Sequence, residues 1–213
     1  MVKKKPPAAT DELSWLELSP SFPTSGLVAG VDEVGRGSLF GPVVAAAVIL
    51  PADAWPKLLV AKIRDSKKLS SSRRTQLAQE IGALALDWKI GFASTAEIDR
   101  LNILQATMLA MRRAVHKLKV QPTLCLIDGN QSLDDLLVPQ ETIIKGDERS
   151  LNIAAASIMA KVWRDELIMR LAVKYHEYDL EHNKGYGSQR HLLALQKYGP
   201  SPLHRLSFAP CRM

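Results

Sequence analysis

Short continuous apolar runs, separated by turn residues, set the pattern of this chain. The runs at residues 26–33, 42–50 and 123–128 predict buried strands, and residues 88–94 and 141–144 predict two more. A short glycine-rich connection joins the first two runs, which predicts that these strands are antiparallel neighbours. The run at 123–128 ends in an acid and is typical of a buried parallel strand.

Helical spacing of apolar positions follows in the segments between and after these runs. Ser70 is an N-cap residue for a predicted helix that reaches about residue 86. Ser94 and Glu97 have the spacing of a capping box, and we assign the apolar stripe of the helix after them, up to Leu118, to the core. Two further helices are predicted over residues 152–174 and 188–198.

These elements predict an α/β fold in which helices cover the faces of a mixed sheet, because antiparallel strands come first and parallel crossovers later. Residues 1–25 are rich in Pro, Ser and Thr, so we expect a flexible leader there. Residues 26–213 are expected to form one domain. With 46% hydrophobic residues, the chain has enough apolar material for a sizeable core.

The charge balance favours a polyanionic partner. The chain carries 28 Lys and Arg against 22 Asp and Glu, a net charge of +6, and nucleic acid is the commonest partner for such an excess. A merely basic surface is an equal alternative on charge alone.

Cysteine usage and the N-terminal residues indicate the compartment. Cys125 and Cys211 predict two reduced thiols rather than a disulfide framework or a zinc site, and the five histidines show no zinc-like spacing. Prolines and acids follow the basic residues 1–5, and no window of roughly 18 apolar residues occurs. We expect a cytoplasmic monomer with no membrane partner.

Four acidic residues lie where the predicted elements would bring ligands together. Asp32 and Glu33 end the first apolar run, Asp128 ends the fourth strand, and Asp165 lies in the long helix. Ligand sites in such sheets form at the ends of strands. The glycines after Glu33 would allow both adjacent acids to turn toward one site.

Clustered carboxylates need cations. At an effective dielectric constant of about 20, two carboxylates about 5 Å apart repel each other by roughly 3 kcal/mol. Oxygen ligands without His or Cys favour Mg²⁺ or Mn²⁺, and two such ions can support phosphodiester cleavage. Ordinary roles stay open for single residues, since Asp165 could pair with Lys161 on its helix and Asp128 could form a turn. The pattern alone therefore predicts a candidate metal site.

An ordered series of motifs resembles the ribonuclease HII family. GVDEVGRGSLFG at residues 30–41 is similar to the opening motif of that family, and the later blocks follow in family order. These blocks are DSKKLS at 65–70, NILQATMLAMRRA at 102–114, DGN at 128–130, KGD at 145–147, AAASIMAKVWRD at 154–165, GYG at 185–187 and GPSPLHRLSF at 199–208.

The resemblance implies a ribonuclease H-like fold, with a mixed five-stranded sheet flanked by helices and a small helical C-terminal part from about residue 180. It implies an endonuclease that hydrolyses the RNA strand of RNA/DNA hybrids. It also implies cutting on the 5′ side of single ribonucleotides embedded in duplex DNA, leaving 3′-hydroxyl and 5′-phosphate ends. The implied cofactor is Mg²⁺ or Mn²⁺, with two ions in the catalytic state.

The resemblance also assigns a catalytic, metal-binding role to four matching positions. They are Asp32, Glu33, Asp128 and Asp165, of which Asp32 would bridge the ions.

Substrate contacts are implied at further matching positions. The Gly35-Arg36-Gly37 turn would read the 2′-hydroxyl through its backbone, Lys67 would contact a phosphate, and Tyr186 would pack on the sugar beyond the junction. A glycine turn suits such a role, because a backbone without side chains can approach a sugar closely.

Three residues near the glycine turn depart from the commonest family pattern. Val34 stands where alanine is usual, Ser38 where proline is usual, and Phe40 where a small residue is usual. The larger side chains of Val34 and Phe40 are expected to shift the turn, which bears on rate and on ion preference.

Two alternative functions are carried forward. A ribonuclease HIII-like nuclease would favour hybrid tracts, but that family usually has an extra N-terminal domain for which the leader here is too short. A nucleic-acid-binding protein that has lost catalysis would not be expected to keep all four acids.

Overall fold

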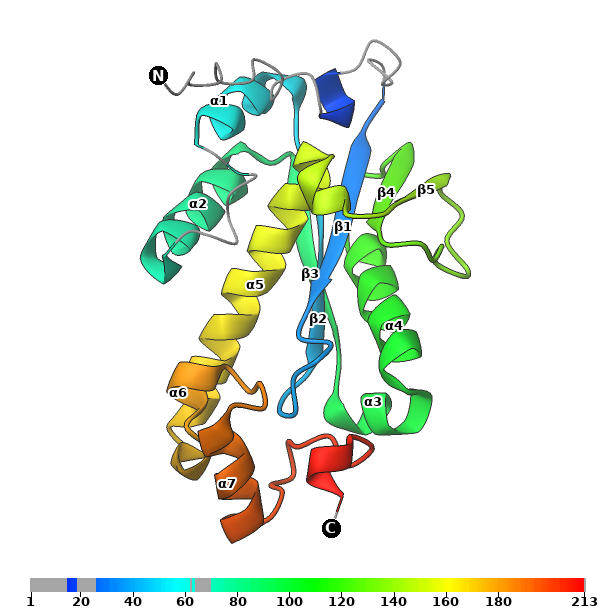
Figure 1. Cartoon of the computed structure of the whole chain (residues 1–213). Helices are drawn as coiled ribbons and strands as arrows, with labels where there is room; N and C mark the ends of the chain where they lie inside the picture. The colour runs from blue at the N-terminus through cyan, green and yellow to red at the C-terminus, as the bar shows by residue number, and fades with distance from the viewer. Residues whose placement is uncertain (1–14, 19–25, 62, 64–69, 213) are drawn as a thin grey trace, which may run out of the picture.

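A five-stranded mixed sheet forms the centre of the computed structural model, which describes residues 15–18, 26–61, 63 and 70–212 (Figure 1). The strand order is β3-β2-β1-β4-β5. Strands β1 and β2 are antiparallel, as are β2 and β3, whereas β4 and β5 run parallel to β1. The predicted fold class and the antiparallel pairing of the first two strands are confirmed. The strands are β1 (Val28–Val34), β2 (Val43–Ile49), β3 (Asp87–Ala93), β4 (Leu124–Asp128) and β5 (Gln140–Ile143).

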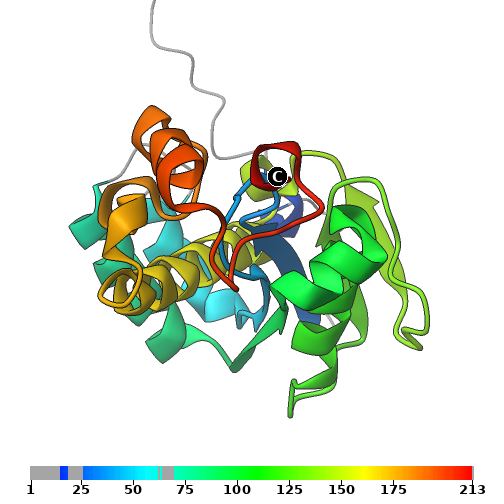
Figure 2. The ribbon, with the colours of Figure 1, turned by 90° about the horizontal axis from the view of Figure 1, so that it is seen from below.

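Helices cover both faces of this sheet, as Figures 1 and 2 show. On one face, α1, α2 and α5 bury an apolar cluster against β2, and on the other, α3 and α4 bury a second cluster against β1 and β2. The helices are α1 (Trp55–Val60), α2 (Ser71–Leu84), α3 (Thr95–Leu101), α4 (Ile103–His116), α5 (Leu151–Ala172), α6 (Leu180–Asn183) and α7 (Gln189–Tyr198).

Two glycines in the sheet allow these helices to approach closely. A Cβ atom on Gly30 of β1 would lie 2.1 Å from the carbonyl carbon of Asn152 in α5. On the opposite face, a Cβ on Gly91 of β3 would lie 2.1 Å from the carbonyl oxygen of Ala110 in α4. Both helices therefore touch the sheet at backbone level, which fixes their position along it.

The single helix predicted after Ser94 is two helices, so this prediction is wrong in one respect. The capping box of Ser94 and Glu97 is present and starts α3. At Asn102 the backbone adopts φ 75°, which ends α3, and the Asn102 side chain accepts a hydrogen bond from Gln105 N at 3.1 Å to cap α4. An apolar stripe continues through such a break, so the pattern alone did not reveal it.

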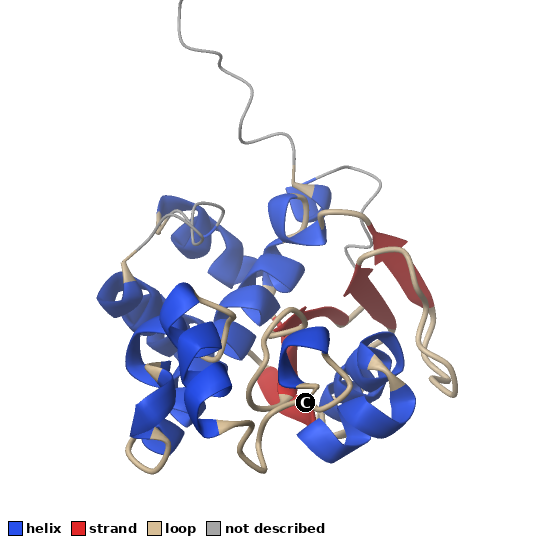
Figure 3. Cartoon of the chain, turned by 60° about the horizontal axis from the view of Figure 1, so that its bottom comes forward, coloured by secondary structure: helices blue, strands red, loops and turns tan. Residues whose placement is uncertain are grey.

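The C-terminal segment packs as a third cluster at one end of the sheet (Figure 3). It joins α6 and α7 to the second half of α5 through Ile168, Leu180 and Leu195, and it encloses Phe40 from the loop after β1. The connection between β1 and β2 is thus held against residues more than a hundred positions later.

The predicted flexible leader is wrong for residues 15–18, and its other residues, 1–14 and 19–25, lie outside the part that the structure describes. Trp15 is buried in the core, and Leu16–Leu18 form a short 3-10 helix. The Glu17 carboxylate accepts hydrogen bonds from Ser150 Oγ at 2.5 Å and from Asn152 N at 3.1 Å. Glu17 therefore accepts hydrogen bonds from donors at the start of α5 that have no partner within the helix.

Across the residues that the structure places, no helix combines the length and the apolar character that a membrane crossing requires.

The buried cap leads to a stability prediction. Glu17→Ala should lower the free energy of unfolding by about 2–3 kcal/mol, because it leaves buried donors of Ser150 and Asn152 without their acceptor. The matched control is Glu80→Ala, which removes a carboxylate of similar size from a half-exposed pair with Arg73 and should cost less than about 1 kcal/mol. Urea unfolding measures both values, and equal losses would remove Glu17 as a cap of α5.

Candidate active site

Two adjacent acids of β1 reach the same space beside this strand. Asp32 and Glu33 lie inside β1 rather than after it, so their side chains start on opposite faces of the strand. The neighbouring strand β4 pairs with β1 only as far as Ile127 opposite Val31. Among the described residues, no strand pairs with β1 on this side beyond that point, and both acids reach the space at the end of β4.

Three carboxylates gather in this space. Asp32, Glu33 and Asp128 each offer an oxygen, and these oxygens lie within 4.8 Å of one another. Asp32 Oδ1 accepts a hydrogen bond from the backbone N–H of Glu33 at 2.6 Å, and Asp128 Oδ1 accepts one from Gly146 N at 2.6 Å. The backbone thus fixes one oxygen of each aspartate, and the cluster has the form of a preformed cation site.

Burial and mutual repulsion both act against negative charge in this cluster. Burial raises the pKa of Asp32 well above its ordinary value, and the nearby charges of Glu33 and Asp128 raise it further. Burial likewise raises the pKa of Glu33, against the opposing effect of Arg36, whose Nη1 lies 3.3 Å from Glu33 Oε1. A cation among these oxygens would offset both effects, and an oxygen-only donor set suits a hard divalent ion.

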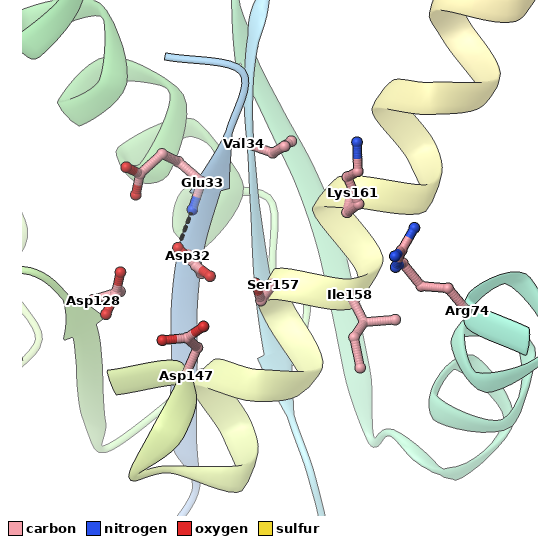
Figure 4. A pocket seen from close by; sticks show the side chains of 9 residues that line it. All are labelled: Asp32, Glu33, Val34, Arg74, Asp128, Asp147, Ser157, Ile158 and Lys161. Carbon is pink, nitrogen blue, oxygen red and sulfur yellow. Dashed lines mark hydrogen bonds between the residues drawn. The ribbon is translucent and has the colours of Figure 1, made fainter. Parts of the chain in front are cut away.

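A fourth acid, Asp147, enters the same pocket from the short 3-10 helix Gly146–Glu148. The pocket has a volume of about 360 Å³. Figure 4 shows the carboxyl group of Asp147 beside those of Asp32 and Asp128. The sequence contained a signal for it, because Lys145-Gly146-Asp147 is one of the recognised blocks, but no role had been assigned to that block.

Asp165 does not join the carboxylates, contrary to the expectation that all four acids converge. It lies eight residues after Ser157, whose side chain hydrogen-bonds Asp32, and this spacing is about 12 Å along a helix. The Asp165 carboxylate pairs with Lys161 Nζ at 2.8 Å and lines a separate hollow between α2 and α5. Asp165 therefore forms the ion pair with Lys161 within the helix, which the sequence had left open as the alternative.

The glycine turn and the Tyr186 loop lie side by side. Ser38 and Tyr186 form an isolated β-bridge, and Leu39 N donates to the carbonyl of Gly185 at 2.8 Å. The hydroxyl of Ser38 lies 2.8 Å from the same carbonyl. Tyr186 keeps 36% of its surface exposed. The structure thus brings together two of the elements that were predicted to contact the substrate.

The buried guanidinium of Arg164 joins these two loops. It donates to Ser38 Oγ at 2.7 Å and to the Lys184 carbonyl at 2.9 Å. The Tyr186 ring centroid lies 5.6 Å from its Cζ. A Cβ on Gly35 would lie 2.3 Å from Arg164 Nε, and Gly35 has φ 90°, so this position needs glycine.

The remaining predicted positions are placed as follows. Lys67 lies outside the described residues. Arg36 is half-exposed beside Glu33, and Gly37 has open space around its Cα. Phe40 is fully buried and meets Tyr175 edge-on at 5.3 Å, so its larger ring is used in the C-terminal cluster rather than at the pocket.

Comparisons with known proteins agree with the fold and with the ordered motifs. The family model described as Ribonuclease HII matches residues 29–211. A ribonuclease HII of Trichormus variabilis is 69% identical over 210 residues, which cover 98% of this chain and 93% of that protein.

Solved structures give the same fold. A ribonuclease H2 from Pyrococcus horikoshii OT3 is similar with a TM-score of 0.76 and 26% identity, over 87% of this chain and 95% of that one. Bst-RNase HIII in complex with Mn²⁺ is similar in fold, with a TM-score of 0.73 and 20% identity, over 87% of this chain and 68% of that one.

Proposed function

Because this chain belongs to the ribonuclease HII family, and is thereby a ribonuclease H endonuclease, we propose that it cuts at single ribonucleotides embedded in duplex DNA. We propose that it also hydrolyses the RNA strand of RNA/DNA hybrids. Cleavage on the 5′ side of the ribonucleotide would leave 3′-hydroxyl and 5′-phosphate ends. The observation that carries this proposal is the group of three carboxylate oxygens within 4.8 Å at the end of β4.

Divalent metal ions suit this group of oxygens. Two ions of Mg²⁺ or Mn²⁺ would supply an activated water and a stabilised leaving oxygen. Asp32 shares this group of oxygens with Glu33 and Asp128, and its carboxylate would be a ligand of both ions. Its position is set by the Glu33 N–H and by the side chain of Ser157 on α5. The chain thereby presents a fixed group of carboxylate oxygens to the ions.

We propose Asp147, rather than Asp165, as the fourth ligand. Asp147 lines the pocket of Asp32, Glu33 and Asp128, whereas Asp165 is engaged with Lys161. The hydrogen bond from Gly146 N to Asp128 ties the turn that carries Asp147 to the cluster.

Recognition of the ribonucleotide is assigned to the two adjoining loops. The backbone of the Gly35-Arg36-Gly37 turn would bind the 2′-hydroxyl, which distinguishes RNA from DNA. The half-exposed ring of Tyr186 would pack on the next sugar, and Lys67 would contact a phosphate. The bridge between Ser38 and Tyr186 supports this proposal, because it holds both loops at a fixed separation.

Two alternatives are separated from this proposal by substrate preference and by turnover. A ribonuclease HIII-like enzyme would prefer continuous hybrids. A binding protein without catalysis would bind the same duplexes without cutting them. The test is Mg²⁺-dependent cutting of a duplex with one embedded ribonucleotide, beside a continuous hybrid and an all-DNA duplex.

The first prediction concerns Asp32. Asp32→Asn should lower cleavage of the embedded ribonucleotide by several orders of magnitude, because the bridging charge is lost, while duplex binding survives. The exposed Asp53 provides a matched control, and Asp53→Asn should cut as the wild type does. Near-full turnover of Asp32→Asn at saturating Mg²⁺ would contradict the bridging role.

A second prediction separates the two candidates for the fourth ligand. Mn²⁺ that binds only the folded cluster should stabilise the wild type by about 2.7 kcal/mol at about 100 times its dissociation constant. Asp147→Asn should weaken this stabilisation and slow cleavage, whereas Asp165→Asn should keep most of the Mn²⁺ effect. Thermal melts with Mn²⁺ and with EDTA measure it, and the reverse order of the two variants would restore Asp165 as a ligand.

A third prediction concerns Tyr186. Tyr186→Ala should lose about 1–3 kcal/mol of transition-state binding, as aromatic contacts to nucleic acids typically do, and mostly on embedded ribonucleotides. Tyr186→Phe keeps the ring and should retain much of the activity. The measurement is the ratio of kcat/KM on embedded ribonucleotides to that on hybrids, with Tyr198→Ala on α7 as control. An unchanged ratio in Tyr186→Ala would leave Tyr186 as a turn residue alone.

A further inference from the structure

Two buried histidines lie directly behind the Tyr186 loop. His191, in the first turn of α7, and His204, in the C-terminal segment, are 0% and 1% exposed. Their Nε2 atoms are 2.9 Å apart. His191 Nδ1 lies 2.9 Å from the carbonyl oxygen of Tyr186, and His204 Nδ1 lies 2.9 Å from the backbone nitrogen of Ser201. These contacts form one continuous chain of hydrogen bonds from Ser201 to Tyr186.

The groups at the two ends of this hydrogen-bond chain determine which nitrogen of each imidazole carries the proton. The backbone N–H of Ser201 only donates, so His204 Nδ1 accepts from it, and the Ser201 hydroxyl, whose Oγ lies 2.8 Å from the same nitrogen, can donate there as well. Neutral His204 therefore carries its proton on Nε2. A carbonyl only accepts, so His191 carries its proton on Nδ1 and leaves Nε2 as an acceptor. The two requirements agree, because His204 Nε2–H then donates to His191 Nε2.

Protonation of either imidazole would disrupt this chain of hydrogen bonds. On His191 an added proton would set two N–H groups against each other across the 2.9 Å contact. On His204 Nδ1 it would face the N–H of Ser201, and only the Ser201 hydroxyl oxygen could accept it. Burial, with the neighbouring His191, lowers the pKa of His204 to about 4, and burial lowers the pKa of His191. Both rings therefore stay neutral near the pH at which an ordinary histidine titrates.

The surroundings of the pair are mainly aromatic. The Tyr178 ring lies 4.6 Å from that of His204, and the Phe40 ring lies 5.1 Å from it, measured between centroids. Asp179, beside Tyr178, slightly favours charge on His191, and Arg205 follows His204 in the chain. The acid is already hydrogen-bonded to His182, with 2.6 Å between Oδ1 and Nδ1. Asp179 therefore does not reverse the effect of burial.

We infer that His191 and His204 are positioning residues that hold Tyr186 by its backbone carbonyl through an ordered chain of neutral imidazoles. The same carbonyl accepts from Ser188 N at 2.8 Å, so two donors from the start of α7 fix it. On the other side, the bridge to Ser38 holds the loop. The inference rests on the proposed function in one respect, namely that Tyr186 senses the junction.

The proton order is tested without any substrate. Nitrogen NMR of the full-length protein with labelled histidine distinguishes the two tautomers of each ring. We expect His191 protonated on Nδ1 and His204 on Nε2, with neither titrating near pH 6.5, where an ordinary histidine does. The opposite tautomer on either ring, or an ordinary titration, would overturn the inference.

The positioning role is tested with two variants of His191, each of which keeps one of its two side-chain hydrogen bonds. In His191→Asn the amide nitrogen can take the place of Nδ1 and donate to the Tyr186 carbonyl. In His191→Gln the amide replaces Nε2, next to His204, and the donor to Tyr186 is lost. A purely structural role would make both variants similar, since each gives up one buried hydrogen bond.

We expect His191→Gln to lower the ratio of kcat/KM on embedded ribonucleotides to that on hybrids by about tenfold, which equals about 1.4 kcal/mol, the size of one hydrogen bond. His191→Asn should restore the wild-type ratio. Equal ratios in the two variants would overturn the positioning role. If the wild type cuts neither substrate, the proposed function fails instead, and the nitrogen spectra still decide the proton order.

Discussion

One buried guanidinium joins the segments on which the proposed recognition surface is built. Arg164 donates to an oxygen of four residues, two of them in the loop after β1, one at the start of β2 and one in the loop after α6; they are Ser38, Phe40, Pro42 and Lys184. A buried charge is tolerated only when its donors are satisfied, so moving any of these segments away would leave a costly unpaired group. Gly35 completes the arrangement, because a side chain there would occupy the place of Arg164 Nε.

The carboxylate cluster, the second half of the proposed site, gathers like charges rather than satisfying one buried charge. Asp32, Glu33 and Asp128 are held together although burial and mutual repulsion disfavour their charges. A cation bound among these oxygens would offset that cost and would stabilise the folded state. Lys161 and Arg74 line the same pocket and provide positive charge at its edge, where an approaching phosphate would otherwise meet only acids.

Local patterns predicted much of this architecture, and the failures have physical causes. Strand positions, the Ser70 cap and the capping box of Ser94 followed from apolar runs and short-range hydrogen bonds. The burial of Glu17 did not, because its partners on α5 lie 133 residues or more away in the sequence. The convergence of Asp165 with the other acids was expected wrongly for a related reason. A motif does not show which way a side chain points from its helix, and the ion pair of Asp165 with Lys161 was predicted only as an alternative. The proposed role of Asp147 depends on Gly146, at the start of the 3-10 helix after β5, donating to Asp128 at the end of β4.

Helix α5 links the two halves of the site and sets the distance between them. Ser157 meets Asp32 in the catalytic pocket, and Arg164, seven residues later, meets the recognition loops, a separation of about 10 Å along the helix axis. The contact of Asn152 with Gly30 prevents α5 from sliding along β1, since no gap remains there. A rigid helix clamped at one end therefore holds Tyr186 at a constant distance from the carboxylates. Under the proposed function, a cut at one position relative to a ribonucleotide junction would require such a fixed distance, and the backbone of a single helix would provide it.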